Sequence, residues 1–312
     1  MTSPLKSIRA SFGQTLVTLA KTNTNLYVVS IDLKSSLFLT EFAKKFPHRF
    51  IECGVAENNA AGVAAGLAKT GKTVFLASFA CFSPAINWAV INQSICQNDL
   101  DVKIVGSHAG LMSGDLGASH QMLEDIALMR TLPNMEVFAP LDASETELIV
   151  KTIAHSHHPA YLRLVRPESP DTHLTKKFTI GKSLVIQSGT KITVCGYGPI
   201  LTQLLDPKYQ NDHLEIINCS SLKPLDDKVI LKSLKKTGRL LVIEDHQQNG
   251  GLGDALAHLV LKQNLRVKFQ HLAVNNQFGQ SGKDYHQLWN YYGLGPAFIN
   301  DAIKKLLPSS HS

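Results

Sequence analysis

A single glutamate, Glu57, stands out in the segment IECGVAENNAAGVAAGLAKTG, residues 51–71. The residues after it are almost entirely Ala, Gly and Val, which predicts a helix that a neighbouring helix can approach closely, as at a subunit interface. A carboxylate in the first turn of a helix is stabilised by the helix dipole. Glu57 is therefore either an ordinary first-turn charge or an acid placed for chemistry.

Two phenylalanines follow the predicted strand TVFLA (73–77) in the sequence SFACF (78–82). Phe79 and Phe82 are three residues apart, and aromatic pairs at this spacing are usually part of a packed core. Two such rings can equally form a flat platform for a heteroaromatic ring. The sequence leaves both interpretations open.

A loop rich in Gly and Ser, SHAGLMSGDLGASHQ (107–121), follows the predicted strand VKIVG (102–106). It carries His108, Asp115 and His120. Loops of this length inside a compact α/β domain are usually functional. Imidazoles titrate near neutral pH, so the two histidines suit proton transfer at hydroxyl groups.

Three further polar residues, Arg9, Ser36 and Arg166, lie near the ends of predicted elements, where isolated arginines are usually solvated. The glycine run NGGLGDAL (249–256) opens a predicted helix and suits either phosphate binding or close packing of helix on strand, of which packing is the commoner reason. The cluster IAHSHHP has histidines spaced closely enough to bind a metal, but it ends a predicted surface helix; these are His155, His157 and His158.

Short runs rich in Val, Ile and aromatic residues alternate with amphipathic helical patterns along the chain. This alternation predicts βαβ units and a parallel sheet covered by helices on both faces. Ligands of such sheets bind beyond the carboxyl ends of the strands, so the candidate residues that follow strands are expected to meet there. The predicted strands are 26–31, 73–77, 102–106, 135–139, 160–164, 192–198, 214–220, 239–245 and 267–274, and the predicted helices include 39–46, 84–95, 121–132 and 296–307.

The polar stretch RPESPDTHLTKKF (166–178) has two prolines and no period, which predicts a linker. A chain of 312 residues is long enough for two domains. The predicted fold class is α/β with two doubly wound domains, a parallel-sheet domain at 1–172 and a smaller mixed-sheet domain at 173–312.

The composition, 44% hydrophobic and 18% charged with a net charge of +6, is that of a globular protein. The Lys and Arg residues are scattered, so we expect a phosphorylated metabolite as the anionic partner and no nucleic acid. Five cysteines without CxxC spacing indicate reduced thiols. The start has no apolar run typical of a signal peptide, and the most apolar window (73–93) is interrupted by Pro84 and two asparagines, so we expect no membrane span and a cytoplasmic location.

Together these segments resemble the C-terminal half of transketolase along nearly the whole chain. RFIECGVAENNAAGVAAGLA is similar to the family's pyrimidine-domain motif, GASHQMLEDIALMRTLPNMEVFAPLDASE to its next signature, and TGRLLVIEDHQQNGGLGDALA to the motif of its C-terminal domain. The resemblance implies a pyrimidine-binding domain at 1–172 and a transketolase C-terminal domain at 173–312. It further implies a thiamine diphosphate enzyme of the pentose phosphate pathway, which transfers a two-carbon ketol unit from a ketose phosphate to an aldose phosphate.

The resemblance also implies roles for single residues. Glu57 matches the catalytic glutamate that hydrogen-bonds the aminopyrimidine ring of the cofactor. Phe82, with Phe79 beside it, matches the aromatic wall against which this ring stacks, while Leu33 in SIDLKSS resembles the residue that supports the bent cofactor, with Asp32 assigned to the same cofactor-binding set. His108 and His120 match the substrate-facing catalytic histidines. The residues that match the sugar-phosphate site are Arg9, Ser36, His108 and Arg166.

Two positions depart from the family pattern. The family usually has GEDG before its second histidine, and its aspartate contacts a substrate hydroxyl. This chain has GDLG, with Leu116 in that place and Asp115 one residue earlier, so the donor sugar is open. A tyrosine that often follows the aromatic pair is replaced by Ala85.

The family binds the diphosphate and its Mg²⁺ (or Ca²⁺) through a GDG…N segment that this sequence lacks. The resemblance therefore implies that a separate N-terminal transketolase subunit holds the metal and the charged end of the cofactor, in an α₂β₂ heterotetramer within which this chain dimerises. No metal site is expected in the chain itself.

Three alternatives remain. The beta-type chain of a 2-oxo-acid dehydrogenase has the same architecture and glutamate, but the phosphate-ligand set argues for sugar phosphates. A deoxyxylulose-phosphate synthase normally carries both halves in one chain. Leu116 and Ala85 favour a non-catalytic regulatory paralogue, whereas the retention of Glu57, His108 and His120 argues against it.

Overall fold

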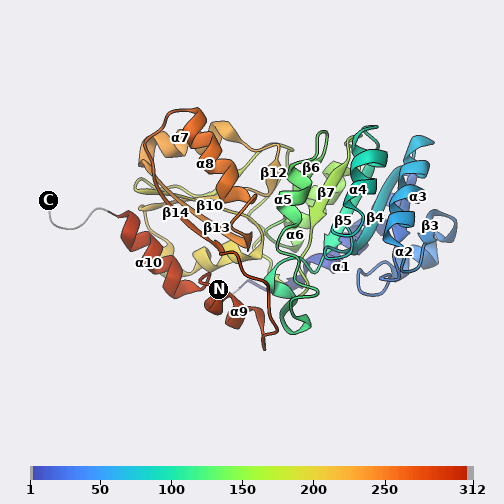
Figure 1. Ribbon diagram of the computed structural model, residues 1–312, viewed down its shortest axis with the longest axis horizontal. Coiled ribbons are helices and arrows are strands. Elements are labelled where there is room, and N and C mark those ends of the chain that lie inside the picture. The colour runs from blue at the N-terminus through green and yellow to red at the C-terminus, as the bar shows by residue number, and fades with distance from the viewer. Residues whose placement is uncertain (1–2, 308–312) are drawn as a thin grey trace.

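The computed structural model describes residues 3–307, so the outer ends of the two predicted domains, residues 1–2 and 308–312, lie outside the described residues. Two α/β units lie side by side along the long axis of the molecule (Figure 1). The first is built on a seven-stranded sheet in the order β12-β6-β7-β5-β4-β2-β3, parallel except for β12. Its strands are β2 (Leu26–Ser30), β3 (Phe50–Glu52), β4 (Thr73–Phe79), β5 (Val102–Ser107), β6 (Glu136–Phe138), β7 (Ala160–Arg163) and β12 (Ser221–Lys223).

Helices cover both faces of this sheet. In β2, Val28 belongs to the core that contains Phe12, whereas its neighbour Val29 belongs to the core that contains Ala61. Successive residues of a strand point to opposite faces, so each face of the sheet has its own core. One face carries α1 (Ile8–Ala20), α2 (Thr40–Lys45) and α6 (Ala143–Ile153), and the other carries α3 (Glu57–Lys69), α4 (Trp88–Val90) with the π-helix η2 (Ile91–Cys96), and α5 (Asp125–Arg130).

The second unit repeats this plan on a smaller scale. Its five-stranded sheet has the order β14-β13-β10-β11-β9, parallel except for β9. The predicted fold class, two doubly wound α/β units of which the second has a mixed sheet, is confirmed. The elements are β9 (Leu184–Gln187), β10 (Ile192–Gly196), β11 (Leu214–Asn218), β13 (Arg239–Gln247) and β14 (Lys268–Val274), α7 (Asp227–Thr237), α8 (Leu252–Lys262), α9 (Tyr285–Tyr291) and α10 (Pro296–Leu306), with the 3₁₀ helices η4 (Pro199–Leu205) and η5 (Pro207–Tyr209).

Two short pairings join segments that the sequence pattern keeps apart. Strand β12 lies beyond the predicted domain boundary, yet it pairs with β6 and extends the first sheet. Strand β1 (Leu5–Ser7) pairs antiparallel with β8 (Glu168–Pro170), inside the stretch 166–178 that was predicted as an irregular linker. At β8 this stretch is regular, because its backbone groups find partners in the N-terminal strand, which no local pattern reveals.

Two predicted helices are shorter than expected. Residues 84–87 form turns, and the helix predicted over 84–95 begins only at α4. The helix predicted over 121–132 begins at α5, because the residues before Asp125 belong to the loop that follows β5. The remaining short helices are η1 (Pro47–Arg49) and η3 (Leu111–Leu116).

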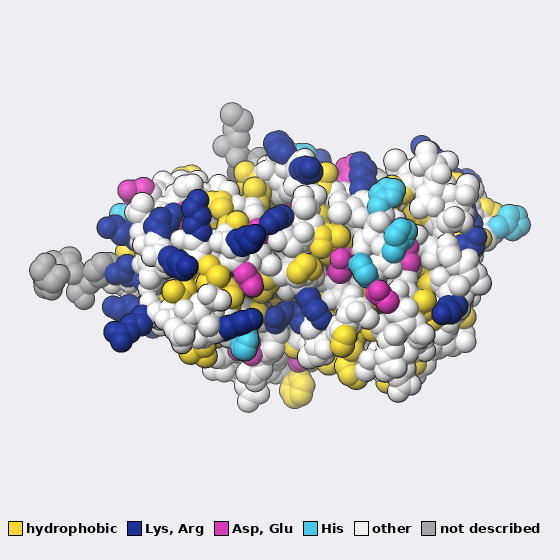
Figure 2. Space-filling model, turned by 90° about the horizontal axis from the view of Figure 1, so that it is seen from above, with side chains coloured by type: hydrophobic (Ala, Val, Ile, Leu, Met, Phe, Trp, Pro, Cys, Tyr) yellow, Lys and Arg dark blue, Asp and Glu magenta, His cyan; other side chains and the backbone are white. Residues whose placement is uncertain are grey.

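The predicted site residues follow the carboxyl ends of the parallel strands, as in other open α/β sheets. The strands β2, β3, β4, β5 and β7 end just before Asp32, Glu57, Phe82, His108 and Arg166. Seen from above, the Lys and Arg side chains of that face gather mostly over the second unit and the histidines mostly over the first (Figure 2).

Candidate active site

Glu57 begins α3, as the sequence predicts. The helix buries its alanines, including Ala60, Ala61 and Ala64, and presents Gly62 and Gly66 on its open side. Asn87 donates from Nδ2 to the backbone oxygen of Glu57 at 3.1 Å, which ties the start of α3 to the turn after the aromatic pair. The side chain of Glu57 is half-buried. Both interpretations of this carboxylate, as a first-turn charge and as an acid for chemistry, remain compatible with its position.

The aromatic pair forms a wall at the end of β4. The rings of Phe79 and Phe82 lie nearly parallel, with an interplanar angle of 20° and centroids 5.9 Å apart. Phe79 is buried and Phe82 is half-buried, so the exposed part of the pair belongs mostly to Phe82. The imidazole of His120 meets both rings edge-on, 5.6 Å from Phe82 and 6.2 Å from Phe79. The wall and the second histidine of the loop therefore belong to one cluster.

His108 continues this cluster at the end of β5. Its ring centroid lies 3.7 Å from that of Phe79, and its Nδ1 shares a hydrogen bond of 2.7 Å with the Ser107 hydroxyl. Burial lowers the pKa of His108 to about 3, and the positive charges of Arg9, Arg166 and His120 add to the effect. The imidazole is therefore neutral at pH 7. A neutral ring can donate or accept a hydrogen bond without carrying a net charge.

Arg9, Ser36 and Arg166 meet beside this histidine. Arg9 donates to the backbone oxygen of Arg166 from Nε (3.0 Å) and Nη2 (2.6 Å), and from Nη1 to that of Ser36 (2.6 Å). Burial, assisted by the charge of Arg166, lowers the pKa of Arg9 to about 10, so the guanidinium stays charged at neutral pH. Two guanidinium groups and a histidine form a corner suited to an anion.

The loop residues 113–116 close this corner. Arg166 donates from Nη1 to the backbone oxygen of Ser113 at 3.2 Å and also pairs with the carboxylate of Asp115. The hydroxyl of Ser113 donates in turn to the backbone oxygen of His108. Leu116 is half-buried at the end of η3. The roles of Ser113 and Asp115 were not predicted, because pairing between residues about fifty positions apart leaves no local signal.

Asp32 and Leu33 lie at the neighbouring end of β2. Asp32 has a left-handed backbone with φ of 57°, and its N–H donates to Glu52 Oε1 at 2.7 Å. Leu33 is half-buried against the core of the first unit. Ala85 packs in a small cluster with Ala80 and other residues near the wall. Within residues 3–307, no side-chain hydrogen bond or ion pair joins Asp32 or Leu33 to the aromatic–histidine cluster.

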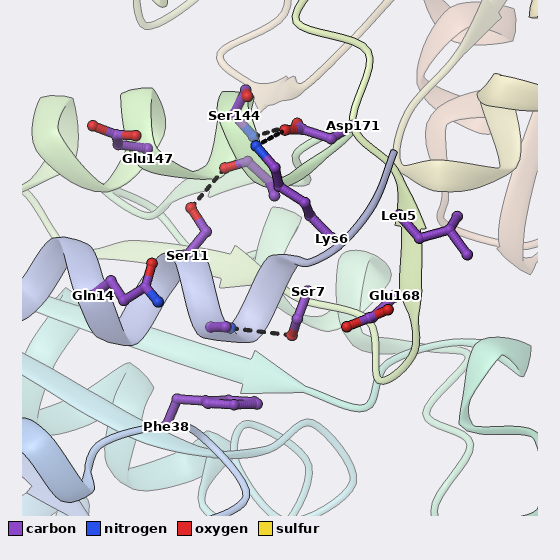
Figure 3. A pocket seen from close by; sticks show the side chains of 12 residues that line it. Leu5, Lys6, Ser7, Ser11, Gln14, Phe38, Ser144, Glu147, Glu168 and Asp171 are labelled. Atoms are coloured by element: carbon purple, nitrogen blue, oxygen red, sulfur yellow. Dashed lines mark hydrogen bonds and ion pairs between the residues drawn. The ribbon is translucent and has the colours of Figure 1, made fainter. Parts of the chain in front are cut away.

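A separate pocket of about 360 Å³ lies between α1 and the start of α6 (Figure 3). Lys6 reaches Asp171 at 2.7 Å, and the Ser11 hydroxyl donates to the backbone oxygen of Ala143 at 2.7 Å. Phe38, which lines this pocket, also lies 5.5 Å from the guanidinium of Arg9. The predicted site residues are not among the described residues that line it, so this pocket is distinct from the cluster around His108.

At the glycine run that begins α8, a carboxylate of the protein itself accepts the free N–H groups of the helix. The N–H groups of Leu252 and Gly253 donate to the carboxylate of Glu244, at 2.8 and 2.9 Å. The Cβ of any side chain at Gly251 would lie 2.3 Å from this carboxylate. Close packing of helix on strand, the commoner of the two interpretations, is therefore the one that the structure bears out.

Two of the three closely spaced histidines pair with carboxylates. His158 lies 2.9 Å from Asp99, and His157 lies 3.4 Å from Asp101. Within residues 3–307, no group of three or more His, Cys, Asp or Glu side chains is arranged to hold a metal ion. In the same part of the chain, no helix is both long and apolar enough to cross a membrane.

Comparison with known proteins covers almost the whole chain. The family model "Transketolase, pyrimidine binding domain" matches residues 6–171, and "Transketolase, C-terminal domain" matches residues 181–299. A protein of Methanocaldococcus jannaschii that bears the name of a transketolase C-terminal section is 39% identical, over 93% of this chain and 92% of the relative. A protein of Phocaeicola vulgatus that is named as one subunit of an apulose-4-phosphate transketolase is 32% identical, over 94% of this chain and 95% of the relative.

A solved structure named "Split gene transketolase, inactive beta4 tetramer" superposes with a TM-score of 0.87 at 35% identity. The match covers 96% of this chain and 98% of that one. Both ends of the match therefore fall close to the ends of the two chains.

Proposed function

The chain belongs to the transketolase family, and on that premise we propose that it is the C-terminal subunit of a two-subunit transketolase acting on sugar phosphates. The transfer would move a two-carbon ketol unit from a ketose phosphate to an aldose phosphate. The observation that carries the proposal is the meeting of Arg9, Arg166 and His108 beside the wall of Phe79 and Phe82. An anion corner and a stacking surface are what a phosphorylated sugar and a heteroaromatic cofactor require.

Membership in this family implies dependence on thiamine diphosphate in general. When bound, this cofactor supplies the nucleophilic carbon and the electron sink that allow a ketose to be cleaved beside its carbonyl. The residues present fit its aminopyrimidine ring. Phe79 and Phe82 offer parallel rings for stacking, and Asn87 has a buried side-chain oxygen without a hydrogen-bond partner within residues 3–307, next to Glu57.

We assign the remaining roles from the match of these residues to the family's motifs. The carboxylate of Glu57 would hold a proton at a nitrogen of the pyrimidine ring, and Leu33 with Asp32 would support the bent cofactor from the end of β2. His108, neutral at pH 7, would hydrogen-bond the sugar, and His120 would move protons at its hydroxyl groups. Arg9 and Arg166, with Ser36, would bind the phosphate.

We further propose that the diphosphate and its divalent cation are held by a separate N-terminal subunit. The names of the relatives support this division, since they describe a C-terminal section, one subunit of an enzyme and a split gene. The solved relative is described as an inactive tetramer of one subunit type, which supports a need for the partner and an assembly with several copies of each chain. A cytoplasmic location and the absence of nucleic-acid and membrane partners stay predictions.

Reconstitution tests the proposal. The chain is mixed with a partner that carries the GDG…N segment, and turnover of a ketose phosphate and of pyruvate is measured with thiamine diphosphate and Mg²⁺. We expect turnover of the ketose phosphate by the pair only. Turnover by this chain alone would contradict the split-subunit assignment, and decarboxylation of pyruvate by the pair would indicate the 2-oxo-acid dehydrogenase instead.

A further inference from the structure

The glycine-rich loop (residues 107–121) is anchored to the second unit at a buried carboxylate. Asp245, near the end of β13, accepts the N–H of Leu111 at Oδ1, 2.8 Å away. Its backbone oxygen accepts Arg163 Nη2 at 2.6 Å, so Asp245 is also tied to β7 of the first sheet. The Cβ of a side chain at Gly110 would lie 2.7 Å from Asp245 Oδ2, and this glycine also has φ of 74°. The loop can approach Asp245 only because residue 110 is glycine.

A second anchor is the strap, defined as residues 276–282 between β14 and α9. Gln121 donates from Nε2 to the backbone oxygens of Gly114 (3.1 Å) and Gln280 (2.9 Å), and so joins the loop to the strap. The N–H of Gly282 donates to the same Gly114 oxygen at 3.4 Å. The strap, drawn in orange-red just before α9, runs beside the loop after β5 (Figure 1). Gln121 is 4% exposed; its bond to Gly114 is buried and its bond to Gln280 is partly buried.

The strap and the loop touch through glycines. The Cβ of a side chain at Gly279 would lie 2.0 Å from the amide oxygen of Gln121, and one at Gly117 would lie 2.7 Å from the hydroxyl of Ser281. Such close approaches leave the loop little room to move while the strap is in place.

The anchored loop carries the groups that face the anion corner. Ser113 lies between the two anchors, and its hydroxyl donates to the backbone of His108 while its backbone oxygen accepts Arg166. His108 itself has a left-handed backbone, with φ of 58°, which the surrounding contacts must maintain. Movement of the loop would therefore displace both the imidazole and the guanidinium.

We propose that the second unit positions the substrate-facing groups of the first, with Gln121 and Asp245 as the positioning residues that fix the loop carrying His108 and Ser113. Neither residue needs to touch the substrate, since each acts through the loop. The inference rests on the proposed function for its catalytic meaning, but the anchoring is a property of this chain alone. It assigns the C-terminal domain a part in substrate binding.

Gln121→Met tests the strap anchor. Methionine keeps the length and volume of glutamine but removes both hydrogen bonds. Gln187→Met is the matched control, because Gln187 Nε2 also donates to backbone oxygens, at 2.7 Å to Asn211 and 2.9 Å to Leu214, far along the chain in β9. In both glutamines the amide oxygen is buried without a hydrogen-bond partner within residues 3–307, so the two substitutions remove the same kinds of contact.

Amide hydrogen exchange of the full chain, followed by mass spectrometry, gives the first readout. We expect peptides covering 108–117 and 276–282 to exchange about tenfold faster in Gln121→Met, because two hydrogen bonds of ordinary net strength are lost. Peptides covering β4 and β10 should be unchanged, and Gln187→Met should leave the loop and the strap as in the wild type. Unchanged exchange over 108–117, or an equal increase over the whole chain, would overturn the proposal.

Gly279→Ala is a second variant that should loosen the contact between the strap and the loop. Its methyl group would force apart the strap and the amide of Gln121, without a backbone penalty from a left-handed φ. Faster exchange of the loop is again expected, and slow exchange in this variant would count against the strap anchor.

The reconstituted pair supplies the catalytic readout. Loosening of the loop should raise KM for the ketose phosphate by about fivefold or more, as expected for the loss of about 1 kcal/mol of positioning, while kcat changes less. A fivefold fall of kcat with KM unchanged would contradict the proposal that the anchored loop positions the phosphate-binding groups. Faster loop exchange in a pair that turns over no sugar phosphate would overturn the proposed function and leave the anchoring intact.

Discussion

The carboxylate of Asp115 pairs with the guanidinium of Arg166 at the corner where Arg9 also donates to the Arg166 backbone. The hydrogen bond and the charge of Arg166 lower the pKa of Asp115, so the acid is ionised at neutral pH. Asp115 is two-thirds exposed, at 66% of its side-chain surface. The proposed phosphate site therefore contains a negative charge. This charge repels a substrate phosphate and competes with it for Arg166.

Replacing Asp115 with Asn should strengthen binding of phosphorylated sugars. The substitution keeps a hydrogen-bond acceptor for Arg166 but removes the charge, and KM for the ketose phosphate should fall by up to about fivefold, because exposed ion pairs contribute little. The effect should shrink at high ionic strength. KM for an unphosphorylated ketose should not change. Asp301→Asn, which breaks a similarly exposed pair with Lys305 on α10, is the control. A raised KM in Asp115→Asn would show that Asp115 helps the site instead.

Glu57→Gln tests the assignment of the catalytic acid. Gln keeps the shape of the side chain and the backbone bond to Asn87, but it cannot hold a proton at a ring nitrogen as a carboxylate does. In the reconstituted pair we expect kcat to fall about a hundredfold or more, the usual contribution of a positioned acid or base. The melting temperature of the chain should stay close to that of Glu147→Gln, a control at an exposed pair on α6. Near-normal turnover would return Glu57 to the status of a first-turn charge.

The local parts of the site follow from sequence alone. A helix beginning at Glu57 and paired rings at Phe79 and Phe82 are both set by residues close in the chain, and the structure has both. The meeting of Arg9 with Arg166 is also expected from the resemblance, because both match one phosphate site. The helix start and the paired rings depend on strand and helix patterns, which short-range residue types determine well.

The anchors of the loop do not follow from sequence. Asp245 reads as an ordinary residue of a buried strand, and its bond to Leu111 joins positions that are 134 apart. The strap has no period at all, and Gln121 reaches it across 159 residues. Strand β12 likewise pairs with β6 across the predicted domain boundary. Each of these contacts depends on how the two units pack, and hydrophobic periodicity carries no information about that.

His108 makes the folded chain sensitive to acid. Its pKa is about 3 in the folded protein, against an ordinary value of 6.5, mainly because the ring is buried. Between these values the unfolded chain binds a proton that the folded chain does not, so stability falls as the pH drops below about 6.5, by about 1.4 kcal/mol per pH unit. Above about pH 6.5, His108 should not change the stability with pH, because its imidazole is neutral in both the folded and the unfolded chain.

The measurement compares urea unfolding of the wild type with that of His108→Gln at several pH values. The free-energy difference between them should shift by about 1.4 kcal/mol in favour of the variant for each pH unit from 6 down to 4. His48→Gln, at an exposed histidine, corrects for general effects of removing an imidazole. A difference that stays constant over this range would mean that His108 is solvated in the folded state.

Glu244 supports the second unit through its negative charge. The carboxylate accepts the N–H groups at the start of α8, a hydrogen bond from Tyr197 at 3.0 Å and one with His271 at 2.7 Å. Burial alone would raise the pKa of Glu244, but the bond to His271, the charge of His246 and the helix N–H groups lower it to about 2. Because the folded pKa lies below the ordinary 4.5, this stabilisation is complete above about pH 4.5 and is lost as the pH falls toward 2.

Glu244→Gln should therefore destabilise the protein by about 3 kcal/mol at pH 7, the free energy that corresponds to a pKa shift of this size. In glutamine an amide NH2 group takes the place of one carboxylate oxygen, which leaves one of the two helix N–H groups without its acceptor. Urea unfolding at pH 7 measures the loss, with Glu41→Gln on the surface of α2 as the control. The difference between wild type and Glu244→Gln should shrink steadily below pH 4.5, because the wild-type carboxylate then gains a proton. Equal stability at pH 7 would mean that the helix start is held by packing, and that the glycine run does not depend on a charge beneath it.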